Sequence, residues 1–278
     1  MIINAAPDIT PQTLTSFYRP LLDQASEFSH PPVSNYKVGA VVIGNSGKAY
    51  LGSNFEVKRG AYGDTIHAEQ FAVTLAKLAG ETGIKAIVVS AEPCGHCRQF
   101  MMETGVCQLP IYFQDSQNKA GPGQPPLWKE TSLGRLLPSP FTLAGERVNL
   151  YTHRPIVRQR VGGGPLSRAK KILVDRALEA AAQSYHPITK DTWAGLAIET
   201  LNGEFATGFP IESAAFNPTM PPLQVALVDL ISKGFRPNQI RRAVLIEPVS
   251  PDLSFKDSTL NTLKKLAPRA QFSCIKGR

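Results

Sequence analysis

The chain has 278 residues and a formal net charge of +8, from 30 Lys and Arg against 22 Asp and Glu, and 42% of its residues are hydrophobic. This length allows two domains, and the apolar content is that of an ordinary globular protein. No apolar run reaches 18 residues, and residues 1–24 lack a basic start followed by an apolar core. Neither a membrane span nor a secretory signal is therefore expected.

The net positive charge comes entirely from the second half of the chain. Residues 1–153 hold 12 basic and 12 acidic side chains, whereas residues 154–278 hold 18 and 10. A basic half can steer nucleic acid. However, the basic cluster between Arg154 and Lys171 contains no aromatic side chain to stack on single-stranded bases. A solvated surface or a subunit contact is favoured, and nucleic acid is not expected as a partner.

The first predicted elements are a helix and a hairpin. Residues 1–30 are predicted to hold one helix, which starts at Pro11, after Thr10. The alternating patterns of 36–43 and 49–57 predict two strands joined by a turn at 45–47. Asn54 and Glu56 then share one face of the second strand. That face is either exposed to solvent or lines a pocket that reads hydroxyl groups.

A helix, a strand and a second helix follow, over residues 67–78, 84–91 and 94–103. The first helix has apolar residues at i, i+4 and i+7, and Asp64 and Thr65 are candidate caps before it. Gly80 and Gly105 are stop signals after the two helices. Further along, residues 110–113 predict a strand, 116–126 a loop, 136–141 an apolar patch, 160–166 a linker and 167–184 a helix.

Candidate metal ligands stand at the starts of the two central helices. Cys94 and Cys97 are three residues apart and share a helix face. His67 and Glu69 would diverge by about 200° in mid-helix, so they converge only on an ion that lies off the helix end. The ion is therefore expected at two helix N-termini, whose dipoles favour thiolates. One imidazole and two thiolates leave a coordination position open, as in catalytic zinc sites, and Glu69 is placed to act as a base.

Simpler interpretations of these residues are a structural zinc site, a redox pair of cysteines, or buried cysteines without a metal. His96 is expected to be an exposed helix residue rather than a ligand, and Arg98 a local ion-pair partner. The combined pattern H-x-E followed by P-C-x-x-C is nevertheless the known signature of zinc-dependent nucleobase deaminases. The remaining cysteines, Cys107 and Cys274, are expected to be free thiols, which favours a reducing cytoplasm.

The second half repeats the pattern of the first. Residues 193–209 echo 37–53, with glycines at matching places, and Glu212 falls opposite Glu56. Pro222-Leu223-Gln224 takes the place of His67-Ala68-Glu69, and Val249 that of Cys94. Because none of these replacements is a zinc ligand or a base, the second copy is predicted to be catalytically dead. The expected organisation is a helical segment at 1–30, a catalytic domain at 31–153 and a degenerate domain at 154–278.

The chain resembles the homodimeric, duplicated cytidine deaminases of enteric bacteria and plants. The motifs that carry this resemblance are His-Ala-Glu-Gln at 67–70, Pro-Cys-Gly-His-Cys-Arg-Gln at 93–99 and Asn-Pro-Thr-Met-Pro-Pro-Leu-Gln at 217–224. The resemblance implies a duplicated three-layer α-β-α fold with a five-stranded sheet in each half. It also implies a cytoplasmic homodimer whose active sites are completed by neighbouring domains.

The resemblance further implies hydrolytic deamination of cytidine and 2′-deoxycytidine in pyrimidine salvage. It assigns one Zn²⁺ per chain, in the first half only, to His67, Cys94 and Cys97, and proton transfer to Glu69. The substrate-binding residues that it implies are Asn54 and Glu56 at the ribose, together with Tyr36, Ala68 and Phe141. Tyr36 stands where the family usually has phenylalanine.

Two rival functions remain. A polynucleotide cytosine deaminase would use the basic second half, but a carboxylate such as Glu56 beside the sugar would repel phosphate. A structural zinc protein acting as a binding module would need no open coordination position.

Overall fold

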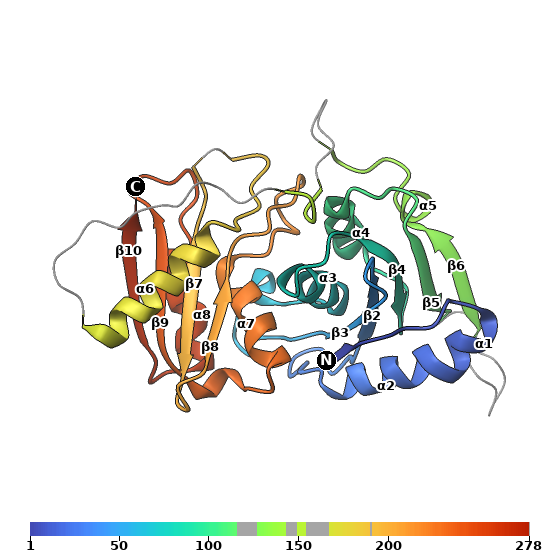
Figure 1. The fold of residues 1–278 in the computed structure, drawn as a ribbon, viewed down its shortest axis with the longest axis horizontal. Helices are drawn as coiled ribbons and strands as arrows, with labels where there is room; N and C mark the ends of the chain where they lie inside the picture. Colours follow the sequence, from blue (N-terminus) through green and yellow to red (C-terminus); the bar gives the residue numbers. More distant parts are fainter. Residues whose placement is uncertain (116–126, 143–148, 154–166, 190, 278) are drawn as a thin grey trace. The chain divides into compact units, whose positions relative to one another are not determined.

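A computed structural model describes residues 1–115, 127–142, 149–153, 167–189 and 191–277 (Figure 1). The chain forms two compact units, the first of residues 1–56 and 65–152, the second of residues 57–64 and 153–278. The loop predicted at 116–126 and the linker predicted at 160–166 lie outside the described residues. None of the helices described is both long enough and apolar enough to cross a membrane.

The first unit is built on a six-stranded sheet with the order β1-β3-β2-β4-β5-β6. Its strands are β1 (Ile2–Ile3), β2 (Gly39–Gly44), β3 (Ala49–Ser53), β4 (Ile84–Val89), β5 (Pro110–Gln114) and β6 (Trp128–Ser132). Only the β4–β5 pair is parallel. The expected five strands are therefore present, and the two-residue strand β1 adds a sixth at the β3 edge.

Helices cover both faces of this sheet. They are α1 (Pro11–Thr13), which a π-helical turn at Leu14–Tyr18 joins to α2 (Arg19–Glu27), then α3 (Ala68–Leu78), α4 (Gly95–Met101), the 3-10 turn η3 (Met102–Thr104) and α5 (Leu133–Leu136). Val41 and Ile43 of β2 pack with Leu22 and Ala25 of α2 in one apolar cluster. On the opposite face, a Cβ on Gly52 would collide with the carbonyl oxygen of Ala68 in α3. The predicted three-layer α-β-α fold is confirmed.

The second unit has a four-stranded sheet, in the order β10-β9-β7-β8, among its described residues. Its elements are α6 (Arg168–Ala181), β7 (Gly195–Thr200), β8 (Phe205–Gly208), α7 (Pro222–Ser232), η4 (Pro237–Gln239), β9 (Ile240–Pro248), α8 (Lys256–Leu266) and β10 (Gln271–Gly277), with η2 (Tyr62–Asp64) from the earlier segment. A fifth strand, expected from the resemblance, is not among these elements. The helix predicted at 167–184 is α6, with Ser167 as its N-cap.

The same packing contacts recur in both units. Gly208 of β8 lies against Pro222 and Ala226 of α7, as Gly52 lies against Ala68 and Ala72 of α3. Likewise α6 packs on Gly195 as α2 packs on Gly39. The predicted duplication is therefore confirmed, and the helix near the N-terminus has a counterpart in the second copy.

The predicted alignment of the two copies at the ligand positions was wrong by one residue. Ile66 bridges Phe55 just before α3, and Met220 bridges Ile211 just before α7. The next residue is the N-cap of each helix, His67 in the first copy and Pro221 in the second. Pro221, Pro222 and Leu223 thus replace His67, Ala68 and Glu69, because the second connecting loop is shorter by two residues rather than one. These residues, too, can neither ligate zinc nor accept a proton.

Residues 57–64 leave the first unit immediately before the first candidate ligand. Within the second unit, the Asp64 carboxylate accepts a hydrogen bond from Thr262 Oγ1 at 2.7 Å. The carbonyl oxygen of Gly63 accepts one from Gln224 Nε2 at 3.0 Å. Contacts made by α7 and α8 therefore hold the short segment that leads to His67.

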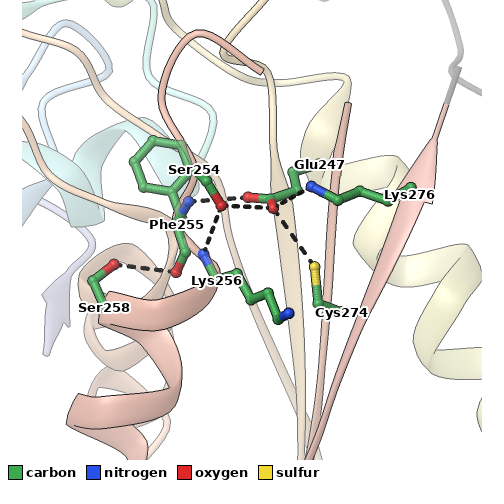
Figure 2. A network of polar contacts seen from close by, with 7 residues as sticks. All are labelled: Glu247, Ser254, Phe255, Lys256, Ser258, Cys274 and Lys276. Atoms are coloured by element: carbon green, nitrogen blue, oxygen red, sulfur yellow. Dashed lines mark hydrogen bonds and ion pairs between the residues drawn. The ribbon is translucent and has the colours of Figure 1, made fainter. Parts of the chain in front are cut away.

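A buried carboxylate joins β9, β10 and α8 (Figure 2). Glu247 is fully buried, and it accepts hydrogen bonds from Ser254 Oγ at 2.8 Å and from the Phe255 backbone amide at 3.0 Å. It also forms an ion pair of 2.7 Å with Lys276. Because Phe255 is the N-cap residue of α8, the carboxylate fixes the start of this helix as well as the edge strand.

Glu247→Ala is expected to destabilise the second unit by about 2–4 kcal/mol, since it leaves buried donors unpaired. Lys276→Met is the matched control, because its ammonium is partly exposed and the carboxylate keeps its other donors. We expect it to cost less than Glu247→Ala, because Ser254 and the Phe255 amide still bind the carboxylate. Urea unfolding followed by circular dichroism measures both variants. Equal losses would show that the ion pair, rather than the helix start, carries the stabilisation.

Candidate active site

The candidate ligands stand at the N-termini of two helices, as the spacing predicted. His67 is the N-cap of α3, and its backbone amide donates to Gln70 Oε1 at 3.2 Å. Cys94 is the N-cap of α4, and Cys97 lies in the first turn of that helix. The predicted caps Asp64 and Thr65 were wrong, because Asp64 belongs to the preceding 3-10 turn and accepts from the Ala61 amide at 2.8 Å.

The donor atoms of His67, Cys94 and Cys97 all lie within 4.8 Å of one another. Cys94 Sγ is 3.6 Å from His67 Nδ1. Tetrahedral zinc bonds of 2.0–2.3 Å place neighbouring ligand atoms about 3.5 Å apart, so small side-chain movements suffice for binding. A donor set of one nitrogen and two sulfurs also favours binding of zinc over binding of magnesium or calcium. The residues present therefore fit a zinc ion.

The pKa values of the two cysteines are shifted in opposite directions. Hydrogen bonds from Cys97 and from His67 lower the pKa of Cys94 to about 3, even though its partial burial opposes this. Burial raises the pKa of Cys97 well above its usual value. The hydrogen bond with Cys94 raises the pKa of His67. A cation that binds both sulfurs as thiolates therefore displaces protons.

Glu69 lies beside these ligands in the first turn of α3, and only 4% of it is exposed. Burial raises the pKa of Glu69, and the Cys97 side chain shares a hydrogen bond with it. A carboxylate whose pKa is shifted towards neutrality both accepts and returns a proton readily. The structure thus brings together one candidate base and three candidate ligands.

His96 lies between the two candidate cysteine ligands, and Arg98 directly follows the second. Neither was predicted to bind the metal. The ring of His96 stacks on that of His67, with centroids 4.9 Å apart at 24°. The prediction of an exposed His96 was wrong, because this residue is half-buried against the candidate ligand His67. Arg98 pairs with Glu92 at 2.6 Å and donates to the Pro93 carbonyl at 2.7 Å, so its predicted role in a local ion pair is confirmed.

Asn54 and Glu56 lie beyond the end of β3, which stops at Ser53. The prediction that they share a strand face was wrong, because the chain leaves the ladder and makes isolated bridges at Phe55. Asn54 is 9% exposed, and its amide accepts from the Val38 amide at 2.9 Å and donates to the Tyr36 carbonyl at 2.8 Å. Asn54 is therefore not exposed to solvent, which was one of the two possibilities left open by the sequence.

The Glu56 carboxylate is held by one loop. It accepts from the backbone amides of Val33 at 2.9 Å and Ser34 at 3.0 Å, and from Ser34 Oγ at 2.5 Å. Burial alone would raise the pKa of Glu56, but these hydrogen bonds outweigh it, and the pKa is lowered. The carboxylate is thus charged and oriented, with lone pairs left for a hydroxyl group.

The three other predicted substrate residues differ in their surroundings. Tyr36 is 58% exposed and precedes β2, so it does not belong to the core. Ala68 is fully buried, and its carbonyl faces Gly52. Phe141 is 60% exposed, and its backbone forms two hydrogen bonds with the Gln99 side chain, at 2.8 and 3.0 Å.

Sequence reasoning missed two contributors to this site. Gln99 ties Phe141 to α4, the helix that carries Cys97, and its only signal was its place in the 93–99 motif. The loop at Val33 and Ser34 contacts Glu56 mainly through backbone amides, which no side-chain pattern reports.

An H-x-E at the start of one helix and a P-C-x-x-C at the start of the next, in a three-layer fold, define the class of zinc-dependent deaminases. Two family models match the chain, at residues 11–113 and 137–260, and both describe a cytidine and deoxycytidylate deaminase zinc-binding region. The chain belongs to the cytidine deaminase family. The second match includes the positions of Pro221 and Leu223, where no zinc ligand stands.

Similar proteins include the cytidine deaminase of Photobacterium profundum, 36% identical over 89% of this chain and 78% of that protein. The cytidine deaminase of Yersinia pseudotuberculosis is 39% identical over 88% of this chain and 78% of its own length. Among solved structures, the cytidine deaminase of Burkholderia pseudomallei is 33% identical, covering 48% of this chain and 100% of that chain with a TM-score of 0.39.

Proposed function

We propose that this chain catalyses the hydrolytic deamination of cytidine and 2′-deoxycytidine to uridine or deoxyuridine and ammonia. The observation that carries the proposal is a buried carboxylate, Glu69, next to a His-Cys-Cys cluster whose donor atoms lie within 4.8 Å of one another. Relatives that match more than four-fifths of the chain bear the name cytidine deaminase. A role in pyrimidine salvage is consistent with this reaction.

The residues of the site divide the chemistry between them. His67, Cys94 and Cys97 would hold Zn²⁺, which when bound supplies the Lewis acidity that lowers the pKa of a water molecule. Glu69 accepts the proton of the attacking water and then returns protons to N3 and to the departing amine of the base. The two helix N-termini add positive potential where negative charge develops.

The Glu56 carboxylate and the Asn54 side-chain amide, which follow β3, bind the sugar of the substrate. Glu56 accepts hydrogen bonds from ribose hydroxyls, and Asn54 holds the loop at 36–38 while offering its remaining amide hydrogen. Ala68, Tyr36 and Phe141 complete the set that surrounds the base. Because an ionised carboxylate repels phosphate, the arrangement favours free nucleosides over nucleotides.

One zinc ion per chain, a homodimer and a cytoplasmic location complete the proposal. Among the described residues, the His67 cluster is the one group of at least three side chains suited to a metal. Cys107 and Cys274 are free thiols, which fits a reducing compartment. Sedimentation equilibrium of the purified chain tests the dimer directly.

An ammonia-release assay with cytidine, deoxycytidine, CMP and a cytosine-containing oligonucleotide tests the function. We expect turnover of the two nucleosides and little of the phosphorylated substrates. Preferred turnover of the oligonucleotide would replace this function with polynucleotide deamination. Zinc binding without any ammonia release would leave a structural zinc module.

Glu56→Gln is expected to raise KM for cytidine about 10- to 100-fold with a smaller change in kcat, since a hydrogen bond to a charged group contributes about 1.5–3 kcal/mol. Steady-state kinetics with cytidine measures the effect. Glu130→Gln, which removes an exposed carboxylate of β6, controls for the change in net charge. An unchanged KM in the Glu56 variant would remove this residue from the sugar site.

A further inference from the structure

The second unit contains a cavity of about 80 Å³ at the place that corresponds to the sugar site of the first. Its lining residues are His186, Thr192, Pro210, Glu212, Phe216, Thr219, Leu253 and Phe255. Phe216 and Leu253 are 50% and 46% exposed and mark its rim. The volume has room for roughly three to five water molecules, enough for the hydroxyl-bearing edge of a small ligand.

The carboxylate in this cavity is held as Glu56 is held. Glu212 Oε2 accepts from the backbone amides of Ile188 at 2.7 Å and Thr189 at 3.2 Å, and Oε1 accepts from Thr189 Oγ1 at 2.8 Å. Two successive amides and a hydroxyl bind Glu56 in the same order. The second copy has thus lost its metal ligands and kept the oriented carboxylate.

Two further polar atoms in the lining are buried without a hydrogen-bond partner among the described residues: Thr192 Oγ1 and His186 Nε2. Only 3% of Thr192 is exposed. A buried polar atom without a partner costs free energy, and an absent ligand or water accounts for it. The unpartnered atoms therefore point to a polar molecule, a ligand or a water, in this cavity.

The polar groups fix the chemistry of the ligand. His186 Nδ1 lies 2.7 Å from the Thr189 carbonyl oxygen and donates its hydrogen to it, so Nε2 is the ring atom left without a partner. The Glu212 carboxylate has acceptor lone pairs beyond the hydrogen bonds that hold it, and the Thr192 hydroxyl both donates and accepts. The walls at Pro210, Phe216 and Phe255 are apolar. A ligand rich in hydroxyl donors with apolar ring faces is complementary to such a site.

We propose that the second unit binds a pentose, either free or as the sugar of a nucleoside, at the Glu212 cavity. This goes beyond the deaminase function, because no group of three candidate metal ligands lies at this cavity among the described residues. The site retains recognition of hydroxyl groups without chemistry, so it senses a nucleoside or pentose instead of converting it.

Methyl NMR of the zinc-loaded full chain with labelled threonine tests the proposal, using uridine, D-ribose and ribose 5-phosphate as probes. The signals of Thr192 and Thr219 are assigned from Thr192→Val and Thr219→Val. We expect saturable shifts of these signals with uridine or ribose, and at least tenfold weaker binding in Glu212→Gln. Ribose 5-phosphate should bind more weakly, because its phosphate is repelled by the carboxylate.

Glu56→Gln is the matched comparison, since it changes the equivalent carboxylate of the first unit and should leave the Thr192 and Thr219 shifts in place. Shifts with ribose identify a pentose site, and shifts with uridine alone identify a nucleoside site. The proposal is overturned if neither probe moves these signals, or if Glu212→Gln binds as tightly as wild type. The readout does not use ammonia release, so it is independent of whether the chain deaminates cytidine.

Discussion

Glu69→Gln is expected to lower kcat for cytidine by about 10³- to 10⁴-fold, the upper part of the usual range for loss of a general acid and base. This corresponds to about 4–5 kcal/mol of transition-state stabilisation. Glutamine has nearly the same shape and fills the same buried position, but it neither accepts the proton of water nor returns it to the base. Steady-state ammonia release measures kcat, and elemental analysis measures the zinc content.

The zinc content of the Glu69→Gln protein should equal that of wild type, because Glu69 is not a ligand in the proposed site. Glu69→Asp is the matched variant, which keeps a carboxylate but withdraws it by one methylene group. We expect it to retain more activity than the glutamine variant. Near-normal turnover by zinc-loaded Glu69→Gln protein would exclude Glu69 from proton transfer.

Cys97→Ser is expected to abolish zinc binding and, with it, activity. Cys97 is fully buried at the start of α4, and its cluster is the one group of at least three candidate metal ligands among the described residues. A serine hydroxyl stays protonated at neutral pH and is a poor ligand for zinc, which prefers thiolate, imidazole and carboxylate donors. We expect about one zinc per chain in wild type and background zinc in the variant.

Cys107→Ser is the control, because Cys107 is an exposed free thiol of the same unit and no part of the cluster. It should bind zinc and turn over cytidine as wild type does. Two zinc ions per wild-type chain, or zinc retained by Cys97→Ser, would contradict a single site in the first half. Circular dichroism distinguishes loss of metal from loss of fold.

The order of helices and strands around the metal site followed from the sequence, because hydrophobic periodicity and glycine stops report local structure directly. The placement of the candidate ligands at two helix N-termini followed as well, since His67 and Glu69 can converge only on an ion that lies off the helix end. The cap of α3 did not follow, because Asp64 has the side chain of a good N-cap but is bound by Thr262, far away in the sequence. Long-range partners of this kind leave no periodic signal.

The surroundings of the sugar-binding candidates were also beyond the sequence. The polar pair Asn54 and Glu56 fitted one face of an extended strand, but the strand ends before them and backbone amides of a distant loop hold Glu56. Backbone donors carry no residue identity. The one-residue error in the alignment at Pro221 has a similar origin. Only the backbone bridges at Ile66 and Met220 show how many residues the second loop lacks.

The path of the chain between the units limits how the protein can be divided. It passes from one unit to the other after residues 56, 64 and 152. Expressing residues 1–153 by themselves would strand segment 57–64 without Gln224 and Thr262, directly ahead of His67. A truncated protein that is to keep these two hydrogen bonds must therefore contain α7 and α8 as well as the candidate metal ligands.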